Sequence, residues 1–532
     1  MLGEPATNKS SAMLFVQRTG LVAGPALAGL LYLLIGPATG SDLGWEAGGE
    51  APSDVARVVL SESGRRCLAV AAWMAVWWIT EAIPVSATAL LPLVLFPVLG
   101  ITTTRAAAAP YGDEIIFLFL GGFVLGISME RSGLHKRIAL GTLSVVGTRP
   151  SMMVGGVMAA TAFMSMWVSN TATTIMMLPI ATSVVVMTER LLAEKRGGHA
   201  WTPQDVERFS LCMLLGIAYA ASIGGLGTPI GTPPNGVLMQ GAQRLLGKQI
   251  AFADWMKIGV PLAVILLPAA WLLLTRVLHP VRGARIEGGA ELIATERREL
   301  GRMSPAEWVV LGVFLLAVVW WLFRVPLCRG LGLMMEDSHG ELVPRITDAG
   351  IAIGAAVLLF VIPVNVRERK CAITWEDAER LPWGVLVLFG GGLSLAAAMS
   401  ATECDKYLGS LFGALGGLPL LLVLGVLVVG VIALSELASN TAIAAALMPV
   451  LAAVGPVMGI DPMLLMVTAA LAATCGFMLP VATPPNAIVF ATGKITIPQM
   501  MRAGILLDVV CAVVIIAFMW LLGPWLLEMV VK

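Results

Sequence analysis

Three adjacent small polar residues, Ser169 to Thr171, lie in the middle of a long apolar run. The same tripeptide returns at Ser439 to Thr441, inside a second apolar run. A hydroxyl or amide that loses water without gaining a partner costs roughly 2–7 kcal/mol. Two copies of one tripeptide therefore indicate that these side chains bind something. The alternative is that small polar residues only let helices pack closely.

The serine and asparagine side chains offer neutral oxygens of the kind that a monovalent cation binds. Ser165 precedes Ser169 by four residues, and Ser435 precedes Ser439 by the same interval. In a helix this spacing puts both hydroxyls on one face, so we expect each pair to lie on the helix that enters the tripeptide.

A second motif, Gly231 to Asn235 (GTPPN), returns as Ala482 to Asn486 (ATPPN). Paired prolines remove backbone donors and clash with the preceding turn, so the helix must unwind there. Unwinding frees carbonyl oxygens, which are ligands for a hard cation such as Na⁺. It also creates helix N-termini, which favour anionic groups.

The charged residues near these motifs are few. No Lys, Arg or His lies in either tripeptide or either proline break. Thr171 and Thr441 are left to donate to a substrate carboxylate, whose charge bound cations and helix dipoles would have to balance. Coupling to cations is therefore expected. Glu436 is a carboxylate at membrane depth, which favours a proton carrier, a part of the cation site, or a structural pair with a nearby amide or hydroxyl.

Composition defines the class of protein that must position these groups. Of 532 residues, 58% are hydrophobic and 13% charged, where a soluble domain has about 25% charged residues. The chain is therefore predicted to be an all-α polytopic membrane protein. The 34 basic and 34 acidic residues balance, so nothing points to nucleic acid. The cysteines and histidines show no ligand or nucleophile spacing, so we expect neither an enzyme nor an organic cofactor.

Apolar run lengths predict eleven transmembrane helices plus two re-entrant helical hairpins, at 151–187 and 418–458. Basic residues such as Lys136 and Arg137 concentrate on one side of this arrangement. The positive-inside rule then puts the N-terminus in the cytoplasm and the C-terminus outside the inner membrane.

The chain also matches itself, because FLFLGG at Phe117 returns as LVLFGG at Leu386 at almost the same offset as the tripeptide, and the proline motif follows in both copies at a smaller offset. We therefore predict two inverted repeats, an arrangement typical of secondary transporters. The predicted division is an N-terminal helix and loop (1–66), a first repeat (67–278, with hairpin 151–187 and broken helix 209–241), a connector (279–305), and a second repeat (306–528, with hairpin 418–458 and broken helix 462–494).

With WWITEAIP from Trp77 to Pro84, these paired motifs resemble the divalent anion/sodium symporter family, the INDY-type di- and tricarboxylate carriers. The resemblance covers residues 60 to 528. It implies a homodimer, in which a mobile transport domain moves past a scaffold domain as an elevator, with one sodium at each hairpin tip. Ser435 stands where many relatives have Thr, which keeps the oxygen ligand.

The resemblance also implies residue roles. Sodium ligands would be Ser165, Ser169, Asn170 and Gly231 at the first tip, and Ser435, Ala438, Asn440 and Ala482 at the second. Substrate contacts would be Asn170, Thr171, Thr232, Pro233, Asn440, Thr441, Thr483 and Pro484.

The function expected from the sequence is sodium-coupled symport of a dicarboxylate anion, a C4 acid such as succinate. Rivals are a sodium-independent dicarboxylate exchanger and a carrier for citrate or sulfate. An intramembrane enzyme would need a nucleophile–base pair or metal ligands at depth, and a channel would not depend on the gradient of a second solute.

Overall fold

The computed structural model describes residues 11–35, 60–147, 149–193, 202–281, 289–336, 340, 342–365, 367–368, 370–404, 407–408 and 417–530. Much of the predicted N-terminal loop, at 36–59, and part of the predicted connector, at 282–288, lie outside these described residues.

The elements up to the middle of the chain are helical and run in this order: α1 Ser11–Leu34, α2 Glu62–Thr80, α3 Val85–Thr88, α4 Leu91–Val98, α5 Thr104–Ala108, the 3₁₀ helix η1 Ala109–Gly112, α6 Glu114–Ser132, α7 Leu134–Val146, α8 Pro150–Ser165, α9 Asn170–Ala193, α10 Pro203–Gly225, α11 Pro233–Leu246, α12 Phe252–Leu272, the π-helix η2 Leu273–Leu278 and α13 Gly289–Glu299.

The later elements include four short strands: α14 Pro305–Leu322, α15 Arg324–Gly330, β1 Met334–Glu336, β2 Leu342–Pro344, α16 Asp348–Val361, β3 Pro363–Asn365, β4 Lys370–Cys371, α17 Trp375–Ala378, α18 Trp383–Ala401, α20 Leu420–Ser435, α21 Asn440–Val457, α22 Pro462–Ala473, α23 Pro484–Phe490, α24 Ile497–Leu521 and α25 Gly523–Val530. Strand β1 pairs with β2, and β3 pairs with β4, both antiparallel.

An all-α chain was expected from the sequence, and these two small sheets are the departure from it. Each strand has at most three residues. Such strands are too short to show the alternating pattern by which strands are recognised in a sequence. They lie in connections on either side of α16 and leave the helical architecture unchanged.

Eight stretches of the described chain are helical, apolar and long enough to cross a membrane: Thr104–Ser132, Asn170–Arg190, Pro203–Gly225, Phe252–Leu278, Pro305–Leu322, Trp383–Ala401, Asn440–Val457 and Ile497–Leu521. Five apolar helices are shorter, among them α8 and α20, which begin the two predicted hairpins. The chain is therefore a multi-pass membrane protein. The number of eleven crossings stays a prediction.

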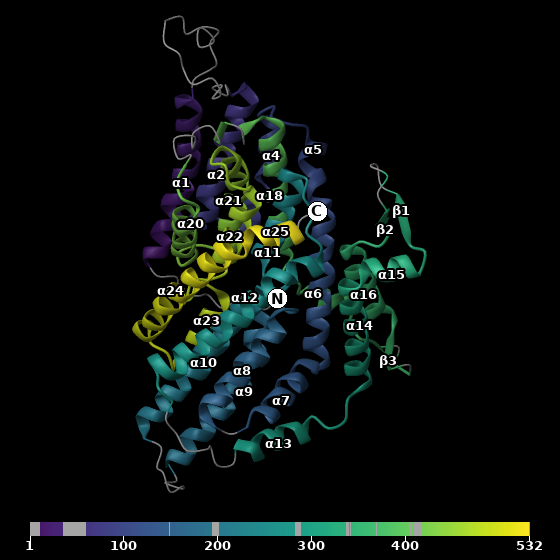
Figure 1. The fold of residues 1–532 in the computed structure, drawn as a ribbon, viewed down its shortest axis with the longest axis vertical. Helices are drawn as coiled ribbons and strands as arrows, with labels where there is room; N and C mark the ends of the chain where they lie inside the picture. Colours follow the sequence, from purple (N-terminus) through teal and green to yellow (C-terminus); the bar gives the residue numbers. More distant parts are fainter. Residues whose placement is uncertain are drawn as a thin grey trace, which may run out of the picture.

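The core of the molecule is formed by the two helices that precede the proline motifs. Nearly all of α10 from Phe209 to Gly225 and of α22 from Met463 to Ala473 is buried. In Figure 1 the first hairpin, α8 and α9, lies in the lower half and the second, α20 and α21, in the upper half. Helices α6, α14 and α16 pack together and form the right side of the same view.

Each proline-broken helix packs against the hairpin that comes from the other half of the chain. Helix α11 contacts α21 and α22, whereas α23 contacts α9 and α10. The helices that follow the two proline breaks are therefore completed by packing against the other half of the chain.

Candidate functional site

The first tripeptide lies at a sharp turn between two helices. Helix α8 ends at Ser165 and α9 begins at Asn170. One terminal atom of the Asn170 amide lies 2.7 Å from Ser165 Oγ, 3.2 Å from Gly231 O and 3.0 Å from Ala221 O. With its nitrogen in that position the amide donates to both carbonyls. With its oxygen there, four oxygens converge, and such an all-oxygen set suits Na⁺.

The predicted placement of Ser165 and Ser169 on one helix is wrong. Ser165 is the last residue of α8, whereas Ser169 precedes α9 and its hydroxyl accepts from the Ala172 amide at 3.3 Å. Likewise, Ser435 ends α20 and Ser439 stands before α21. Serine is favoured at the start of a helix because its oxygen accepts from a free backbone amide there. The role of Ser169 as a sodium ligand stays a prediction.

The second tripeptide, with the turn between α20 and α21 that precedes it, forms the tip of the second hairpin. This second tip contains two buried acceptor atoms that lack a partner among the described residues. Ser435 Oγ and Asn440 Oδ1 are shielded from solvent and form no hydrogen bond with the described residues. A buried polar atom without a partner costs about 1–3 kcal/mol. A cation coordinated by both oxygens would remove this cost, so the residues present fit a sodium ion.

The unwound segment of the second half approaches this tip closely. A Cβ atom built on Gly476 would lie 3.2 Å from Ser435 O and 3.5 Å from Ala482 Cβ. The structure therefore brings the predicted ligands Ser435 and Ala482 close to the same glycine. Ala438 is buried in the turn between α20 and α21.

Glycine is required for the equivalent approach at the first tip. A Cβ on Gly225 would lie 2.6 Å from Asn170 Oδ1 and 3.2 Å from Gly231 O. Contacts under about 3 Å are not tolerated between such atoms. The absence of a side chain thus lets the end of α10 lie directly against the tip.

The asparagine that ends each proline motif closes the unwound segment before it. Asn235 Nδ2 donates to Gly225 O at 3.2 Å and to Thr228 O at 2.9 Å. Asn486 Nδ2 donates to the equivalent Gly476 O at 3.4 Å and Leu479 O at 3.0 Å. Neither side chain was predicted as a site residue, although the repeated PPN motif contained the signal. Unwinding leaves carbonyls unpaired, and a buried amide can pair two of them.

The threonines before the prolines are the last residues before α11 and α23. Thr232 and Thr483 are both buried and extended. The Thr483 hydroxyl accepts from the Asn486 amide at 3.3 Å, whereas Thr232 makes no such cap. Proline follows each threonine and is half-buried at Pro233 and exposed at Pro484. Both threonines therefore stand at helix N-termini, where an anion is favoured.

The tips and breaks are also linked by direct contacts that differ between the halves. In the first half the Thr228 hydroxyl donates to the Met166 carbonyl. In the second half Glu436 accepts from the Met478 and Leu479 amides at 2.8 and 2.9 Å. Of the three roles considered for Glu436, the structure shows the pairing with backbone amides.

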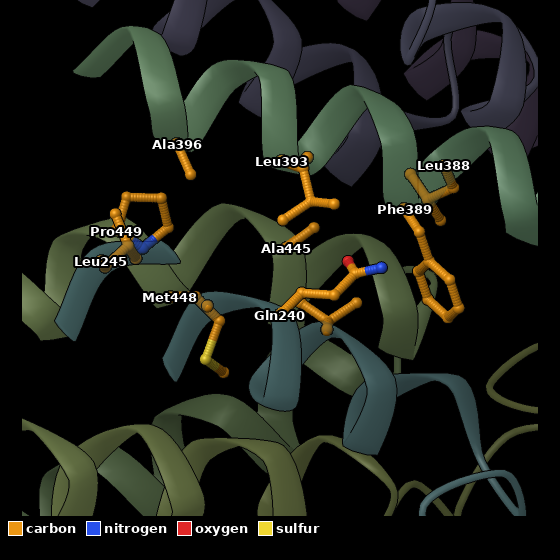
Figure 2. A pocket seen from close by; sticks show the side chains of 12 residues that line it. Gln240, Leu245, Leu388, Phe389, Leu393, Ala396, Ala445, Met448 and Pro449 are labelled. Atoms are coloured by element: carbon orange, nitrogen blue, oxygen red, sulfur yellow. The ribbon is translucent and has the colours of Figure 1, made fainter. Parts of the chain in front are cut away.

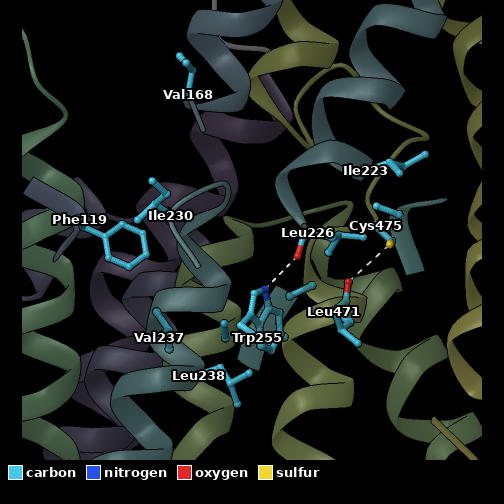
Figure 3. Close-up of a cluster of buried hydrophobic side chains, with 14 of the residues drawn as sticks. Phe119, Val168, Ile223, Leu226, Ile230, Val237, Leu238, Trp255, Leu471 and Cys475 are labelled. Atoms are coloured by element: carbon cyan, nitrogen blue, oxygen red, sulfur yellow. Dashed lines mark hydrogen bonds between the residues drawn. The ribbon is translucent and has the colours of Figure 1, made fainter. Parts of the chain in front are cut away.

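Further contacts hold the first break from the side. The Trp255 indole donates to Leu226 O at 3.0 Å, and Trp255 belongs to the same buried apolar cluster as Ile230 and Val237 (Figure 3). The Ala221 carbonyl beside Asn170 was not predicted, because no sequence motif distinguishes one helical carbonyl from another. Asp508, which accepts from the Phe477 amide at 3.2 Å, was also missed. As a carboxylate inside an apolar segment, Asp508 could have been recognised from the sequence as a candidate functional residue.

Two of the ion pairs that join the halves lie just after the broken helices. Lys494, after α23, lies 2.6 Å from Glu189 in α9. Lys248, after α11, lies 3.7 Å from Asp461 before α22. Each pair thus connects the end of one broken helix with the hairpin side of the other half.

With this geometry in place, the chain can be compared with known families. The model of the sodium:sulfate symporter transmembrane region matches residues 56–529. The chain therefore belongs to this divalent anion/sodium symporter family and is a membrane transporter rather than an enzyme.

Individual relatives are similar over nearly the whole chain. The sodium-dependent dicarboxylate transporter SdcS of Staphylococcus saprophyticus is 41% identical over 509 residues, which are 96% of this chain and 92% of the relative. SdcS of Staphylococcus aureus strain RF122 is 40% identical over 510 residues, 96% and 91% of the two chains.

Two solved structures share the fold at low identity. The YdaH transporter of Alcanivorax borkumensis aligns with a TM-score of 0.58 at 15% identity, covering 96% of this chain and 98% of the other. MtrF of Neisseria gonorrhoeae aligns with a TM-score of 0.55 at 12% identity, covering 96% and 97%. These likenesses support the helical architecture alone.

Proposed function

We propose that the protein is a sodium-coupled symporter that imports a dicarboxylate, a four-carbon acid such as succinate. The observation that carries this proposal is the pair of hairpin tips. At each tip the side-chain amide of Asn170 or Asn440 lies among buried oxygen atoms, next to the unwound segment that precedes the paired prolines. The SdcS relatives, which are named as sodium-dependent dicarboxylate transporters, support the choice of ion and substrate.

The proposed order in which cations and substrate bind follows from the negative charge of the substrate. Cations bind first, one at Ser165, Ser169, Asn170 and Gly231 and one at Ser435, Ala438, Asn440 and Ala482. A carboxylate then meets the helix N-termini and the donors of Thr171, Thr441, Thr232 and Thr483. Because no basic side chain lies at either tip, the anion depends on the bound cations. By linkage the anion raises the cation affinity by the same factor.

Within the membrane we propose eleven crossings and two re-entrant hairpins, related as inverted repeats. Three equivalences support the repeat: the Asn235 and Asn486 contacts, the reciprocal packing of α11 and α23, and the ion pairs of Lys248 and Lys494 with the opposite half. The N-terminus is cytoplasmic and the C-terminus outside the inner membrane in this proposal.

Movement is proposed to occur as an elevator, in which the two hairpins and broken helices form a transport domain. Helix α18 packs against α11 and α21, and a cavity lined by all three opens between them (Figure 2). Its lining is apolar except for Gln240, whose Nε2 is buried without a partner among the described residues. An apolar interface that is incompletely packed would allow α11 and α21 to slide along α18. The proposed scaffold domain consists of α2, α6, α14, α16 and α18. Two copies of the chain are proposed to form a homodimer.

The decisive experiment is uptake of radiolabelled succinate into proteoliposomes with and without an inward sodium gradient. We expect accumulation only with the gradient. Accumulation that needs internal dicarboxylate and no sodium would instead show an exchanger. Citrate and sulfate in the same assay test the alternative substrates.

A further inference from the structure

A crevice of about 480 Å³ lies between the end of α7 and one face of α13. Its walls include Leu143 and Gly147 from α7 and the turn after it, and Ile293, Arg297 and Arg298 from α13. None of the described residues at the hairpin tips or the proline breaks lines this crevice. It is therefore separate from the candidate site for sodium and substrate.

The position of the crevice is close to the surface of the membrane. Helix α13 ends at Glu299, and α14, which is apolar and long enough to cross a membrane, begins at Pro305. In Figure 1 α13 lies below α7, near the lower end of the view. The Val145 side chain next to the crevice is 85% exposed. An apolar side chain exposed beside the start of a membrane-crossing helix is placed to contact lipid.

The two walls of the crevice are held in place by Arg137 of α7. Its guanidinium donates to the Glu307 carboxylate of α14 at 2.8 Å. It also donates to the carbonyls of Gly301 and Leu300, at 3.1 and 3.3 Å, in the connection between α13 and α14. These bonds fix α7 against the segment that carries α13, so the crevice is formed before any ligand enters it.

Two cations at the crevice lack a counter-charge. In contrast to Arg137, neither Arg297 nor Arg298 forms an ion pair with a residue that the structure describes. Both are exposed, and the acidic residues of their own helix do not pair with them: Glu291, Glu296 and Glu299. The lining residue Ser144 is engaged already, since its hydroxyl donates to a backbone carbonyl of α7 at 2.7 Å. The charge of the crevice therefore favours an anion.

The apolar part of the crevice narrows the choice of anion. Leu143 and Ile293 are 1% and 5% exposed and form an apolar wall below the two arginines. A small soluble dicarboxylate would meet the arginines but would gain nothing from this wall. A phosphatidylcholine carries its own cation beside its phosphate. An anionic phospholipid offers an uncompensated phosphate, which suits the planar donors of arginine, and an acyl chain for the apolar residues.

We propose that the crevice between α7 and α13 binds the headgroup of an anionic phospholipid, with the phosphate at Arg297 and Arg298 and the first part of an acyl chain along Leu143 and Val145. Helix α7 packs on α8, and α13 contacts α9. A lipid that bridges α7 and α13 therefore also stabilises the base of the first hairpin. This inference goes beyond the proposed function and does not depend on sodium coupling.

The test uses the full-length protein in neutral detergent, titrated with phosphatidylglycerol while the midpoint of thermal unfolding is measured. We expect phosphatidylglycerol to raise the midpoint. Each basic residue near an anionic lipid contributes roughly fivefold in affinity, so Arg297→Gln combined with Arg298→Gln should raise the half-saturating lipid concentration by on the order of twentyfold. Replacing both arginines with Lys, which keeps the charge, should change it by less than about threefold.

Arg302→Gln is the matched control, because Arg302 is exposed just after α13 and does not line the crevice. It should leave the half-saturating concentration unchanged. Native mass spectrometry gives a second measurement: the unmodified protein and the control should retain one phosphatidylglycerol per chain that the double Gln variant loses.

Four results would overturn the inference. Equal stabilisation by phosphatidylcholine would show that the anionic charge is not recognised. An equal loss of lipid affinity in Arg302→Gln would show a general attraction to basic residues rather than a site. Stabilisation by glycerol 3-phosphate at the same concentration would identify a free phosphate, not a lipid, as the ligand. A lower midpoint of the double Gln variant before lipid is added would show that the two arginines are structural.

Discussion

The Lys494 ammonium lies 2.6 Å from the Glu189 carboxylate, so the segment after α23 is tied to α9 of the other half. Both side chains are partly exposed, at 32% and 46%. Exposed ion pairs contribute about 0.2–1 kcal/mol. A double-mutant cycle with Lys494→Gln and Glu189→Gln on thermal stability should give a coupling in that range that falls in high salt. A salt-independent coupling of several kcal/mol would contradict this.

Replacing the tip asparagines tests the cation sites. Asn170→Ala and Asn440→Ala each remove an oxygen that lies among buried acceptors. We expect each to raise the sodium requirement of uptake by at least about tenfold, since a lost charge-assisted contact is worth about 1.5–3 kcal/mol. Ser183→Ala, on the exposed side of α9, is the matched control. Unchanged sodium dependence in both asparagine variants would refute the assignment of Asn170 and Asn440 as sodium ligands.

Gly225→Ala tests the close approach of α10 to the first tip. The added methyl would lie 2.6 Å from Asn170 Oδ1, and overpacking of this kind costs about 1–3 kcal/mol. Uptake should be strongly reduced while the protein stays in the membrane. Gly425→Ala, in α20, meets no atom within 4 Å and should behave like the unmodified protein. Equal uptake by the two variants would show that the approach is unimportant.

The asparagines of the proline motifs should contribute to stability. Asn235→Ala and Asn486→Ala each leave two carbonyls of an unwound segment without their partner. The expected loss is about 1–3 kcal/mol in each case, measured as a lower midpoint of thermal unfolding in detergent. Because the two contacts are equivalent, similar losses are expected. A loss confined to one variant would argue against equivalent breaks.

Acid sensitivity should involve His135 in α7. Its side chain is buried, with Nδ1 3.1 Å from Met129 O, and burial lowers the pKa of this imidazole. A lowered pKa means that the folded state binds the proton less well than the unfolded state. Stability is then complete above about pH 6.5 and declines as the pH falls through the folded-state pKa. His135→Gln should reduce the loss of thermal stability between neutral and mildly acidic pH. An unchanged acid profile would refute this.

Much of the site follows from local sequence, since paired prolines cannot continue a helix and small polar residues at depth need partners. The repeated spacing of the two motifs also indicated which segments are equivalent. The exact helix ends could not be foreseen, because the start of α9 at Asn170 depends on the cap that Ser169 supplies. The Ala221 carbonyl and the contact of Asp508 with Phe477 could not be predicted, since only the packing of α10 and α24 brings them to the breaks.

The reciprocal packing of the broken helices has a consequence for biogenesis. Helix α11 needs α21 and α22, and α23 needs α9 and α10. During synthesis the first half therefore leaves the ribosome with the face of α11 that contacts α21 and α22 uncovered. It stays so until residues beyond Pro462 have been inserted. For that interval α11 lacks the helices that it packs against, and incompletely packed chains of this kind are what insertion chaperones and quality-control proteases act on.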